Sequence, residues 1–275
     1  MVKPLLSICL CCYNDAPYLD LLLKSIKDNT KLLYEVCIID NDSTDNTSEI
    51  IDKHIFSDGH ISNGINEKNV GVIGVNKAVE MSIGEYIVDM NSDMVVLPNW
   101  DIKMMNFLRR LEAINNGLAS VSATLIEPYP GNPEYYFGDF GTHPDNFKYD
   151  GLLRNISHYQ KDGIKKKDTI QFSHPIMMSR KTWDNIGGIS LGYPFPGMCT
   201  DVDLGFKLLW SRAKCVMVGD AFVYHFSSAT LNRMRSEGYG TPAGVQEFIK
   251  KWHKHPDDMY KKYKVREEYK WPTTS

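Results

Sequence analysis

The segment from Tyr34 to Asp45 limits most narrowly what this chain can fold into. It holds four consecutive apolar residues at positions 36 to 39, and three acids lie between positions 40 and 45. An uninterrupted apolar run of this length is typical of a parallel strand that is covered on both faces. Asp40 is therefore expected at the carboxyl end of a strand, the edge at which open α/β sheets bind ligands. Ser43 is a good cap for a following helix, and an Asx turn at that helix is an alternative explanation of the acids.

Strands and helices alternate over the first half of the chain. Such alternation predicts right-handed crossovers and an α/β fold, in which a mostly parallel central sheet carries helices on both faces. The expected strands are residues 5–12, 34–40, 60–66 and 84–90, and the expected helices start after Asp15 and cover residues 45–54 and 72–82.

The sequence changes character after Leu125. Residues 127–151 are rich in Pro, Gly, Tyr and Phe and have no sustained period, which in a compact chain is typical of a functional loop. A helix expected from Thr241 carries an apolar stripe and a Lys-rich face, which predicts a terminal helix packed on the core. Between these segments we expect a basic connector at 161–168, regular structure at 171–178, a helix from about Asp203, and two short strands at 214–218 and 222–226.

Size and charge exclude several classes of protein. The 275 residues are 43% hydrophobic and 24% charged, which is ordinary for a globular protein with a substantial core. A net charge of −3 gives no general attraction to nucleic acid, so no general nucleic-acid binding is expected. Because no window approaches the roughly 20 apolar residues of a membrane span and the N-terminus lacks a signal-sequence pattern, the chain is expected to be cytoplasmic. The six cysteines are expected to be small buried thiols.

Acidic and imidazole side chains follow several of the expected strands. Asp40 ends the second strand, Asp93 follows the fourth, Asp201 opens a helix, and His225 ends the last short strand. Each alone is explained as well by a turn, a helix cap or a structurally satisfied histidine. Together they can converge on one edge of the sheet, where a carboxylate and an imidazole suit Mn²⁺ or Mg²⁺. Such an ion takes phosphate oxygens of a substrate into its shell, which leaves Asp201 free to act as a general base.

At these residues the chain resembles a family 2 glycosyltransferase with the GT-A fold. The resemblance spans about residues 1–252, and the order and spacing of its elements are specific. Its motifs are CYND at 12–15, IIDNDSTDNT at 38–47, NVGVIGVNKAVEMSIGEYIVDMNSD at 69–93, SRKTWDNIGG at 179–188, TDVDLGFKLLWSRAK at 200–214, VYH at 223–225 and FIKKW at 248–252.

The resemblance implies a metal-dependent enzyme that transfers a sugar from a nucleotide diphosphate sugar to an acceptor hydroxyl with inversion of configuration. A UDP-sugar is the favoured donor. Asp93 and His225 are implied to bind the divalent cofactor, Mn²⁺ or Mg²⁺, and Asp201 is implied to be the catalytic base.

Five further residues are implied to bind the donor. Tyr13 would stack on the nucleotide base, and the Asp40 carboxylate would accept a hydrogen bond from a base N–H. Asn69, Asn76 and Ser92 match positions at the nucleotide-sugar pocket.

The resemblance also implies an organisation and partners. Residues 1–125 would form a nucleotide-sugar-binding α/β half, 126–240 an acceptor-side catalytic half of the same GT-A domain, and 241–275 a helical tail. The expected acceptor is a saccharide or a lipid-linked saccharide in the assembly of a surface glycan. The basic tail is expected to allow peripheral contact with the inner face of a membrane.

Two positions depart from the family pattern. Asn91 stands at the first acid of the DxD motif, and Thr200 stands where Glu is common. The alternative function is therefore a catalytically weak or inactive protein that binds carbohydrate or nucleotide sugar on the same fold. A sugar nucleotidyltransferase and a dinucleotide oxidoreductase are not favoured, because no Gly-rich phosphate loop follows the first strand.

Overall fold

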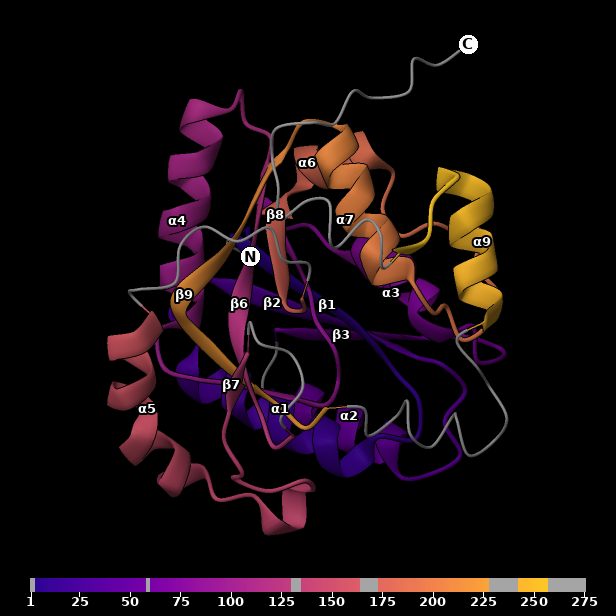
Figure 1. The fold of residues 1–275 in the computed structure, drawn as a ribbon. Coiled ribbons are helices and arrows are strands. Elements are labelled where there is room, and N and C mark those ends of the chain that lie inside the picture. The colour runs from indigo at the N-terminus through magenta and orange to yellow at the C-terminus, as the bar shows by residue number, and fades with distance from the viewer. Residues whose placement is uncertain (1–2, 58–59, 130–134, 164–172, 228–241, 257–275) are drawn as a thin grey trace.

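One β-sheet runs through the described part of the chain. The structure is a computed structural model that describes residues 3–57, 60–129, 135–163, 173–227 and 242–256 (Figure 1). The strands lie in the order β3-β2-β1-β4-β8-β6-β9-β5, and β7 pairs with β6. Their bounds are β1 (Leu6–Cys12), β2 (Tyr34–Asp40), β3 (Ile61–Ile65), β4 (Tyr86–Asp89), β5 (Met94–Val96), β6 (Ala119–Glu127), β7 (Tyr136–Phe137), β8 (Ile176–Ser179) and β9 (Lys214–His225).

Most strand pairs are parallel, as the alternating pattern predicts. The pairs β3–β2, β2–β1, β1–β4, β6–β9 and β6–β7 are parallel. Strand β8 is antiparallel to both β4 and β6, and β5 is antiparallel to β9. The sheet therefore confirms the expected α/β class with a mostly parallel centre.

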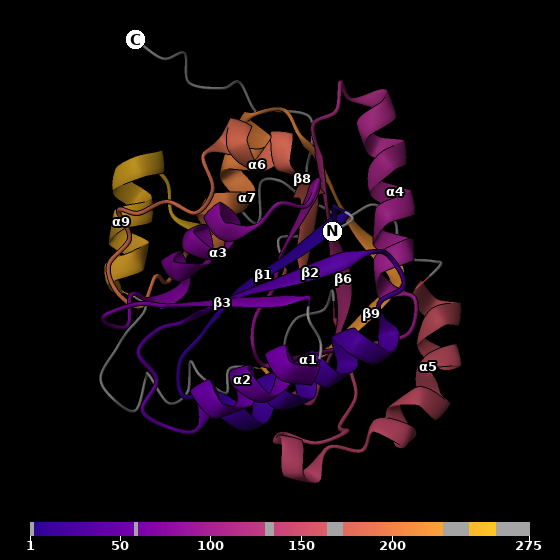
Figure 2. The same cartoon turned by 180° about the vertical axis from the view of Figure 1, so that it is seen from behind.

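Helices cover both faces of the sheet (Figures 1 and 2). The apolar side chains of α1, α2 and α4 pack on one face, and those of α3, α6 and α7 pack on the other. The helices are α1 (Ala16–Asn29), α2 (Thr47–Ser57), α3 (Val75–Met81), α4 (Trp100–Ile114), α5 (Tyr149–Gly163), α6 (Arg180–Ile186), α7 (Thr200–Trp210) and α9 (Pro242–Trp252), with 3₁₀ turns η1 (Gly71–Gly74) and η2 (Pro144–Asn146). No helix among these is long and apolar enough to cross a bilayer.

Strand alternation explains how a continuous apolar run serves both faces. In β2, Val36 and Ile38 join the core under α1 and α2, while Cys37 and Ile39 join the core under α3. Successive side chains of a strand point to opposite faces, so a strand in the middle of a two-sided sheet needs apolar residues at every position. This arrangement fixes the direction of β2 and brings Asp40 to its carboxyl end.

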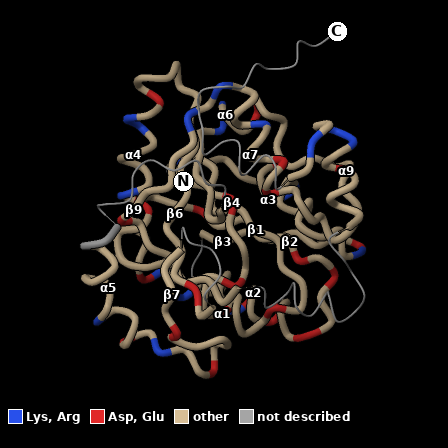
Figure 3. Tube along the Cα trace, in the orientation of Figure 1, with Lys and Arg blue, Asp and Glu red and all other residues tan. Residues whose placement is uncertain are grey.

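The terminal helix packs on the core as expected. Phe248 of α9 is fully buried, and its ring meets Phe206 of α7 edge to face with 5.5 Å between centroids. Trp252 lies 5.6 Å from the same Phe206 ring. Figure 3 shows the basic positions of α9 near its carboxyl end, where Lys250 and Lys251 occupy the last turn. The rest of the expected tail, from residue 257, lies outside the described residues.

The expectation of a long irregular stretch at 127–151 is wrong in part. Its described residues hold β7, η2 and the start of α5. Within this stretch, the ring of Phe147 lies 4.9 Å from that of Tyr224 and 5.2 Å from that of Phe226, and the following residues of α5 join the same buried cluster. Aromatic packing therefore orders a segment whose Pro and Gly content suggests a loop. The expected connector at 161–168 begins within the last turn of α5, and its remainder lies outside the described residues.

The expectation of two short strands at 214–218 and 222–226 is right in the segments that pair with β6 and wrong in their separation. Residues 214–225 form the single strand β9, which pairs with β6 along its length. Its register shifts where Val218 and then Phe222 face consecutive residues of β6. The intervening residues bulge and interrupt the ladder locally, and the strand continues on the far side of the bulge.

The expected boundary at residue 125 lies within β6. One sheet connects the residues on both sides of this position. The division into 1–125, 126–240 and 241–275 stays a prediction.

Candidate active site

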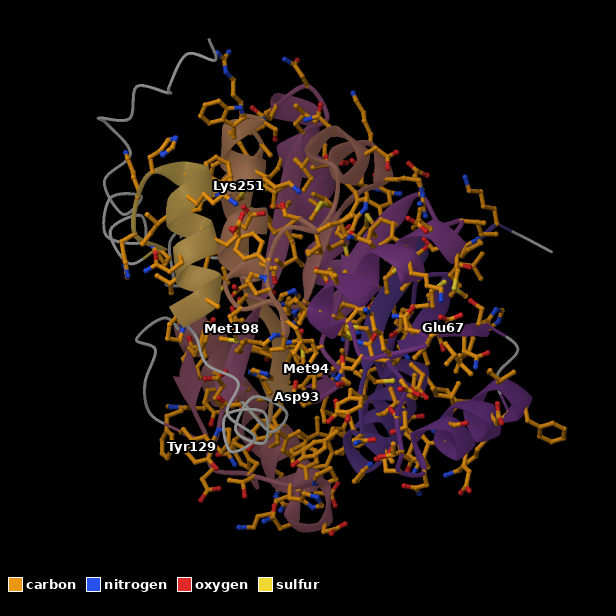
Figure 4. All side chains as sticks on the ribbon, turned by 90° about the vertical axis from the view of Figure 1, so that its right-hand side faces the viewer. Glu67, Asp93, Met94, Tyr129, Met198 and Lys251 are labelled. Atoms are coloured by element: carbon orange, nitrogen blue, oxygen red, sulfur yellow. The ribbon has the colours of Figure 1, made fainter. Side chains whose placement is uncertain are left out.

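A cavity of about 350 Å³ opens at one edge of the sheet, next to the carboxyl ends of β1, β4 and β9. Six of the eight predicted site residues line it. Figure 4 shows one of them, Asp93, near the centre of the molecule with Met198, another lining residue, above it. The six are Tyr13, Asn69, Ser92, Asp93, Asp201 and His225. The structure therefore brings six of the predicted site residues to one cavity, and their roles stay predictions.

Asp93 and His225 lie side by side, as predicted. The Nε2 atom of His225 is 3.3 Å from Oδ1 of Asp93. The other ring nitrogen, Nδ1, lies 2.7 Å from Oε1 of Glu127. Burial opposes the charged imidazole, but the carboxylates of Asp93 and Glu127 outweigh this effect and raise the pKa of His225 to about 10. Sequence reasoning missed Glu127, although an acid at the end of a buried strand is the same signal that identifies Asp40.

A second imidazole–carboxylate pair lines the same cavity. Nε2 of His174 lies 3.2 Å from Oδ2 of Asp89, the last residue of β4. Burial opposes the charge on His174, but the negative charge of Asp89 outweighs it and raises the pKa, with a smaller contribution from Asp201. Sequence reasoning missed both residues, because only the antiparallel pairing of β4 with β8 brings them together.

The loop after β1 is tied to the loop after β2. The backbone N–H groups of Thr44 and Asp45 donate to Oδ1 of Asn14 at 2.7 and 3.3 Å. Oδ1 of Asp40 accepts from the backbone N–H of Ser43 at 3.0 Å, three residues further on. The Asx turn that was the alternative explanation is formed by Asp45, whose Oδ1 accepts from the backbone N–H of Thr47 at the start of α2 at 3.0 Å. Asp40 is buried and is not among the residues that line the cavity.

Ser92 has a structural partner within the site. Its hydroxyl donates to Oδ2 of Asp15 at 2.8 Å, and both residues are buried and line the cavity. This bond joins the loop after β1 to the segment that carries Asp93. Asp15 is a further lining residue to which sequence reasoning gave only the role of starting a helix.

The two predicted asparagines have different surroundings. Asn69 lines the cavity; its Oδ1 accepts from the N–H of Gly71 at 2.8 Å, and its Nδ2 is buried without a hydrogen-bond partner in the described part of the chain. Asn76 instead makes two hydrogen bonds to the backbone of Ile189, at 2.8 and 2.9 Å. Asn76 therefore fastens α3 to the segment after α6 and does not line the cavity.

Asp201 and Asp203 occupy the first turn of α7 but face different surroundings. Asp201 is partly exposed and lines the cavity. Asp203 is fully buried and accepts hydrogen bonds from the hydroxyls of Ser190 and Tyr193. It also accepts from Nε1 of Trp252 at 2.7 Å and pairs with Lys251, which Figure 4 shows on α9. Asp203 therefore holds α9 against α7, and Asp201 is the acid that faces the cavity.

A close backbone contact forms one wall of the cavity. Gly71 has a φ of +70°, and a Cβ atom at this position would lie 2.2 Å from the carbonyl oxygen of Pro196. The N–H of Val72 donates to that same carbonyl at 3.2 Å. Because only glycine avoids the collision, Gly71 allows the segment before α7 to lie against η1. This contact sets where the chain enters the helix that carries Asp201.

The chemistry of Asp93 and His225 fits a divalent metal ion. In the described ranges, no group of three or more His, Cys, Asp or Glu side chains could hold a metal ion. The Asp93–His225 pair nevertheless offers an oxygen and a nitrogen ligand at the cavity wall, with Glu127 on the opposite ring nitrogen, as is usual for a metal-binding histidine. An ion with two protein ligands would complete its shell with substrate oxygens.

Comparison with known proteins gives the family. A sequence profile described as glycosyl transferase family 2 matches residues 7–182. An uncharacterized glycosyltransferase of Haemophilus influenzae is 28% identical over 205 residues, which cover 70% of this chain and 63% of that protein. The putative teichuronic acid biosynthesis glycosyltransferase TuaG of Bacillus subtilis is 28% identical over 188 residues, which cover 66% of this chain and 71% of TuaG. The chain thus spans a little less than two thirds of the Haemophilus protein.

A solved structure gives the fold. The mannosyltransferase PcManGT from Pyrobaculum calidifontis, in complex with GDP-Man and Mn²⁺, has a TM-score of 0.62 to this chain at 16% identity. The alignment covers 97% of this chain and 70% of the mannosyltransferase. The profile covers more than half of the sequence, and the shared architecture extends over nearly all of it. This chain therefore belongs to glycosyl transferase family 2 and has the GT-A fold.

Proposed function

We propose that this glycosyltransferase transfers a sugar from a nucleotide diphosphate sugar to an acceptor hydroxyl with inversion of configuration. The observation that carries the proposal is the cavity, because it brings Asp201 at the start of α7 to the same space as Asp93 and His225. A base on one side of a sugar and a site for the leaving diphosphate on the other are what a direct displacement requires.

Asp201 is the proposed general base. Its carboxylate lines the cavity, whereas the carboxylate of Asp203 is fully buried and bonded to α9 and to the segment before α7. Asp201 can therefore take the proton from an acceptor hydroxyl as that oxygen attacks the anomeric carbon. His174 and Asp89 lie in the same cavity, where they shape the charge around the reacting groups.

Asp93 and His225 would hold the divalent ion, Mn²⁺ or Mg²⁺. When bound, the ion supplies positive charge that stabilises the leaving diphosphate. The charge of the cavity supports this assignment: its described lining includes four aspartates, Asp15, Asp89, Asp93 and Asp201, which outnumber its two histidines, and neither Lys nor Arg. A diphosphate would be repelled by such a wall unless a cation lay between them. PcManGT was solved with Mn²⁺ and GDP-Man together, which is consistent with this arrangement.

Donor recognition is proposed to begin at the ends of β1 and β2. Tyr13 lines the cavity and would stack on the nucleotide base. Asp40 shapes the adjacent turn through Ser43, and it would meet a base N–H at the side of this turn. Asn69 and Ser92 line the cavity and complete the proposed donor pocket, with Asn76 supporting α3 behind it.

The favoured donor remains a UDP-sugar, and a GDP-sugar is the main competitor because PcManGT was solved with GDP-Man. A saccharide or lipid-linked saccharide is the proposed acceptor in surface-glycan assembly, in line with the name of TuaG. We place this work in the cytoplasm, at the inner face of a membrane, where the Lys-rich tail from residue 241 onward would meet anionic lipid.

A screen of nucleotide sugars by thermal shift, with and without Mn²⁺, tests the proposal. A donor that binds only the folded chain raises the melting temperature, and the rise grows with the logarithm of the donor concentration relative to its Kd. Slow hydrolysis of the same donor without acceptor would then separate an active transferase from an inactive binding protein. A chain that gains no stability from any UDP- or GDP-sugar in the presence of Mn²⁺ would contradict the proposal.

A further inference from the structure

His225 lies between two acids because of the order of three strands. Strand β9 is flanked by β6 on one side and by β5 on the other. Glu127 ends β6, which runs parallel to β9, and Asp93 precedes β5, which runs antiparallel to it. All three side chains therefore reach the same edge of the sheet, with the imidazole in the middle.

The two acids differ in which ring nitrogen they contact. Oε1 of Glu127 lies 2.7 Å from Nδ1 of His225, and Oδ1 of Asp93 lies 3.3 Å from Nε2. A carboxylate only accepts hydrogen bonds, so Nδ1 carries the hydrogen in the shorter contact. Nδ1 is therefore engaged by Glu127, and Nε2 is the nitrogen on the side of Asp93.

The position of Glu127 next to the imidazole of His225 is well fixed. Glu127 is 9% exposed, and its carbonyl accepts from the N–H of Gly138 at 2.9 Å. The residue before it, Ile126, pairs with Tyr224, the neighbour of His225, in the β6–β9 ladder. Backbone pairing on both sides of the contact thus sets the positions of the carboxylate and the imidazole relative to each other.

We propose that Glu127 is a positioning residue that holds His225 with Nε2 turned toward a divalent cation shared with Asp93. The inference rests on the metal role in the proposed function. Glu127 does not touch the cation; it fixes the ring orientation and makes Nε2 a better ligand. Loss of such an outer partner commonly weakens metal affinity about 10- to 100-fold.

The test measures Mn²⁺ binding to the full chain without any sugar donor, from the electron paramagnetic resonance signal of free Mn²⁺. Glu127→Ala is expected to weaken binding by about 10- to 100-fold. Glu127→Gln is expected to lose less, because its amide oxygen can still accept from Nδ1. Glu112→Ala is the matched control: Glu112 is a partly buried glutamate that accepts from the hydroxyl of Tyr86 and lies away from His225 and Asp93.

A double-variant cycle distinguishes positioning from a general structural role. If Glu127 acts through the imidazole, Glu127→Ala should add no further loss of Mn²⁺ affinity in a His225→Ala background. A second loss of the same size in that background would overturn the proposal. If Glu127→Ala does not fold, the same cycle with Glu127→Gln decides the question.

The result also separates this inference from the proposed function. Wild-type chain that binds Mn²⁺ and a Glu127→Ala variant that binds it equally well would overturn the inference and leave the transferase proposal intact. Wild-type chain that binds no Mn²⁺ would overturn both the metal role and the inference. Donor binding in the thermal-shift screen would still report on sugar transfer independently.

Discussion

Replacing Asp203 should weaken the packing of α9 on α7 and leave the proposed catalytic residues in place. The carboxylate is fully buried and receives four donors: the hydroxyls of Ser190 and Tyr193, Nζ of Lys251 and Nε1 of Trp252. In Asp203→Ala these donors lose a shared acceptor, and the positive charge of Lys251 loses its partner. The change should therefore appear first as a loss of stability.

The size of the loss follows from the burial of the ion pair. A single hydrogen bond to a charged group is worth about 1.5–3 kcal/mol, but four bonds to one carboxylate do not add independently. Breaking an ion pair that is buried on both sides costs about 3–5 kcal/mol, and because the side chain of Lys251 is 35% exposed we take this range as the upper bound for Asp203→Ala. In a chain of this size it corresponds to a fall in melting temperature of roughly 6–20 °C. Asp203→Asn keeps the shape and one acceptor and should lose about 1–3 kcal/mol.

Urea denaturation followed by circular dichroism and tryptophan fluorescence measures the loss. Trp252 makes the fluorescence informative, because its ring packs on Phe206 and its N–H donates to Asp203. Asp201→Ala is the matched control, since this aspartate lies two residues earlier in the same helical turn. We expect its free energy of unfolding to stay within about 0.5 kcal/mol of the wild type.

The opposite pattern would refute the reasoning. An Asp203→Asn variant with normal stability and no turnover, beside an Asp201→Asn variant with normal turnover, would make Asp203 the base. It would also show that the buried network is not what holds α9 in place.

Four further results are expected. Asp201→Asn should lower kcat about 10²- to 10⁴-fold with nearly unchanged donor affinity, measured by steady-state kinetics and calorimetry; equal losses in both would contradict a base. Asp93→Ala should abolish the part of the thermal shift by donor that depends on Mn²⁺, and a persisting Mn²⁺ effect would reject this ligand. Gly71→Ala should cost about 1–3 kcal/mol in urea denaturation, because the φ of +70° strains an L-residue and the Cβ meets a backbone carbonyl. The stabilising contribution of His174, whose folded-state pKa is raised, should be fully present below about pH 6.5 and should disappear as the pH rises through the folded pKa; a stability difference between wild type and His174→Gln that grows with pH would contradict this sign.

Local patterns predicted the class of fold and the edge of the sheet at which the cavity opens. Val36 to Ile39 form a strand buried on both faces. Asp93 comes after a strand and Asp201 stands at the start of a helix, and both line the cavity. These predictions succeed because a strand in a two-sided sheet and the turn after it depend mainly on residues adjacent in the sequence. The same local signals miss α5 and divide β9, because aromatic packing and strand pairing there outweigh the loop-like composition.

The sequence by itself determined the alternating elements, the α/β class and a cluster of acids with one histidine at the sheet edge. Only the tertiary structure decided which side chains contact one another at this edge. Glu127 reaches His225 because β6 lies next to β9, and His174 reaches Asp89 because β8 lies next to β4. Likewise, Asp201 faces the cavity while Asp203 binds α9, although both stand in one helical turn. Periodicity predicts which face of an element is apolar. It does not predict which other element packs on that face, because that depends on contacts between residues far apart in the sequence.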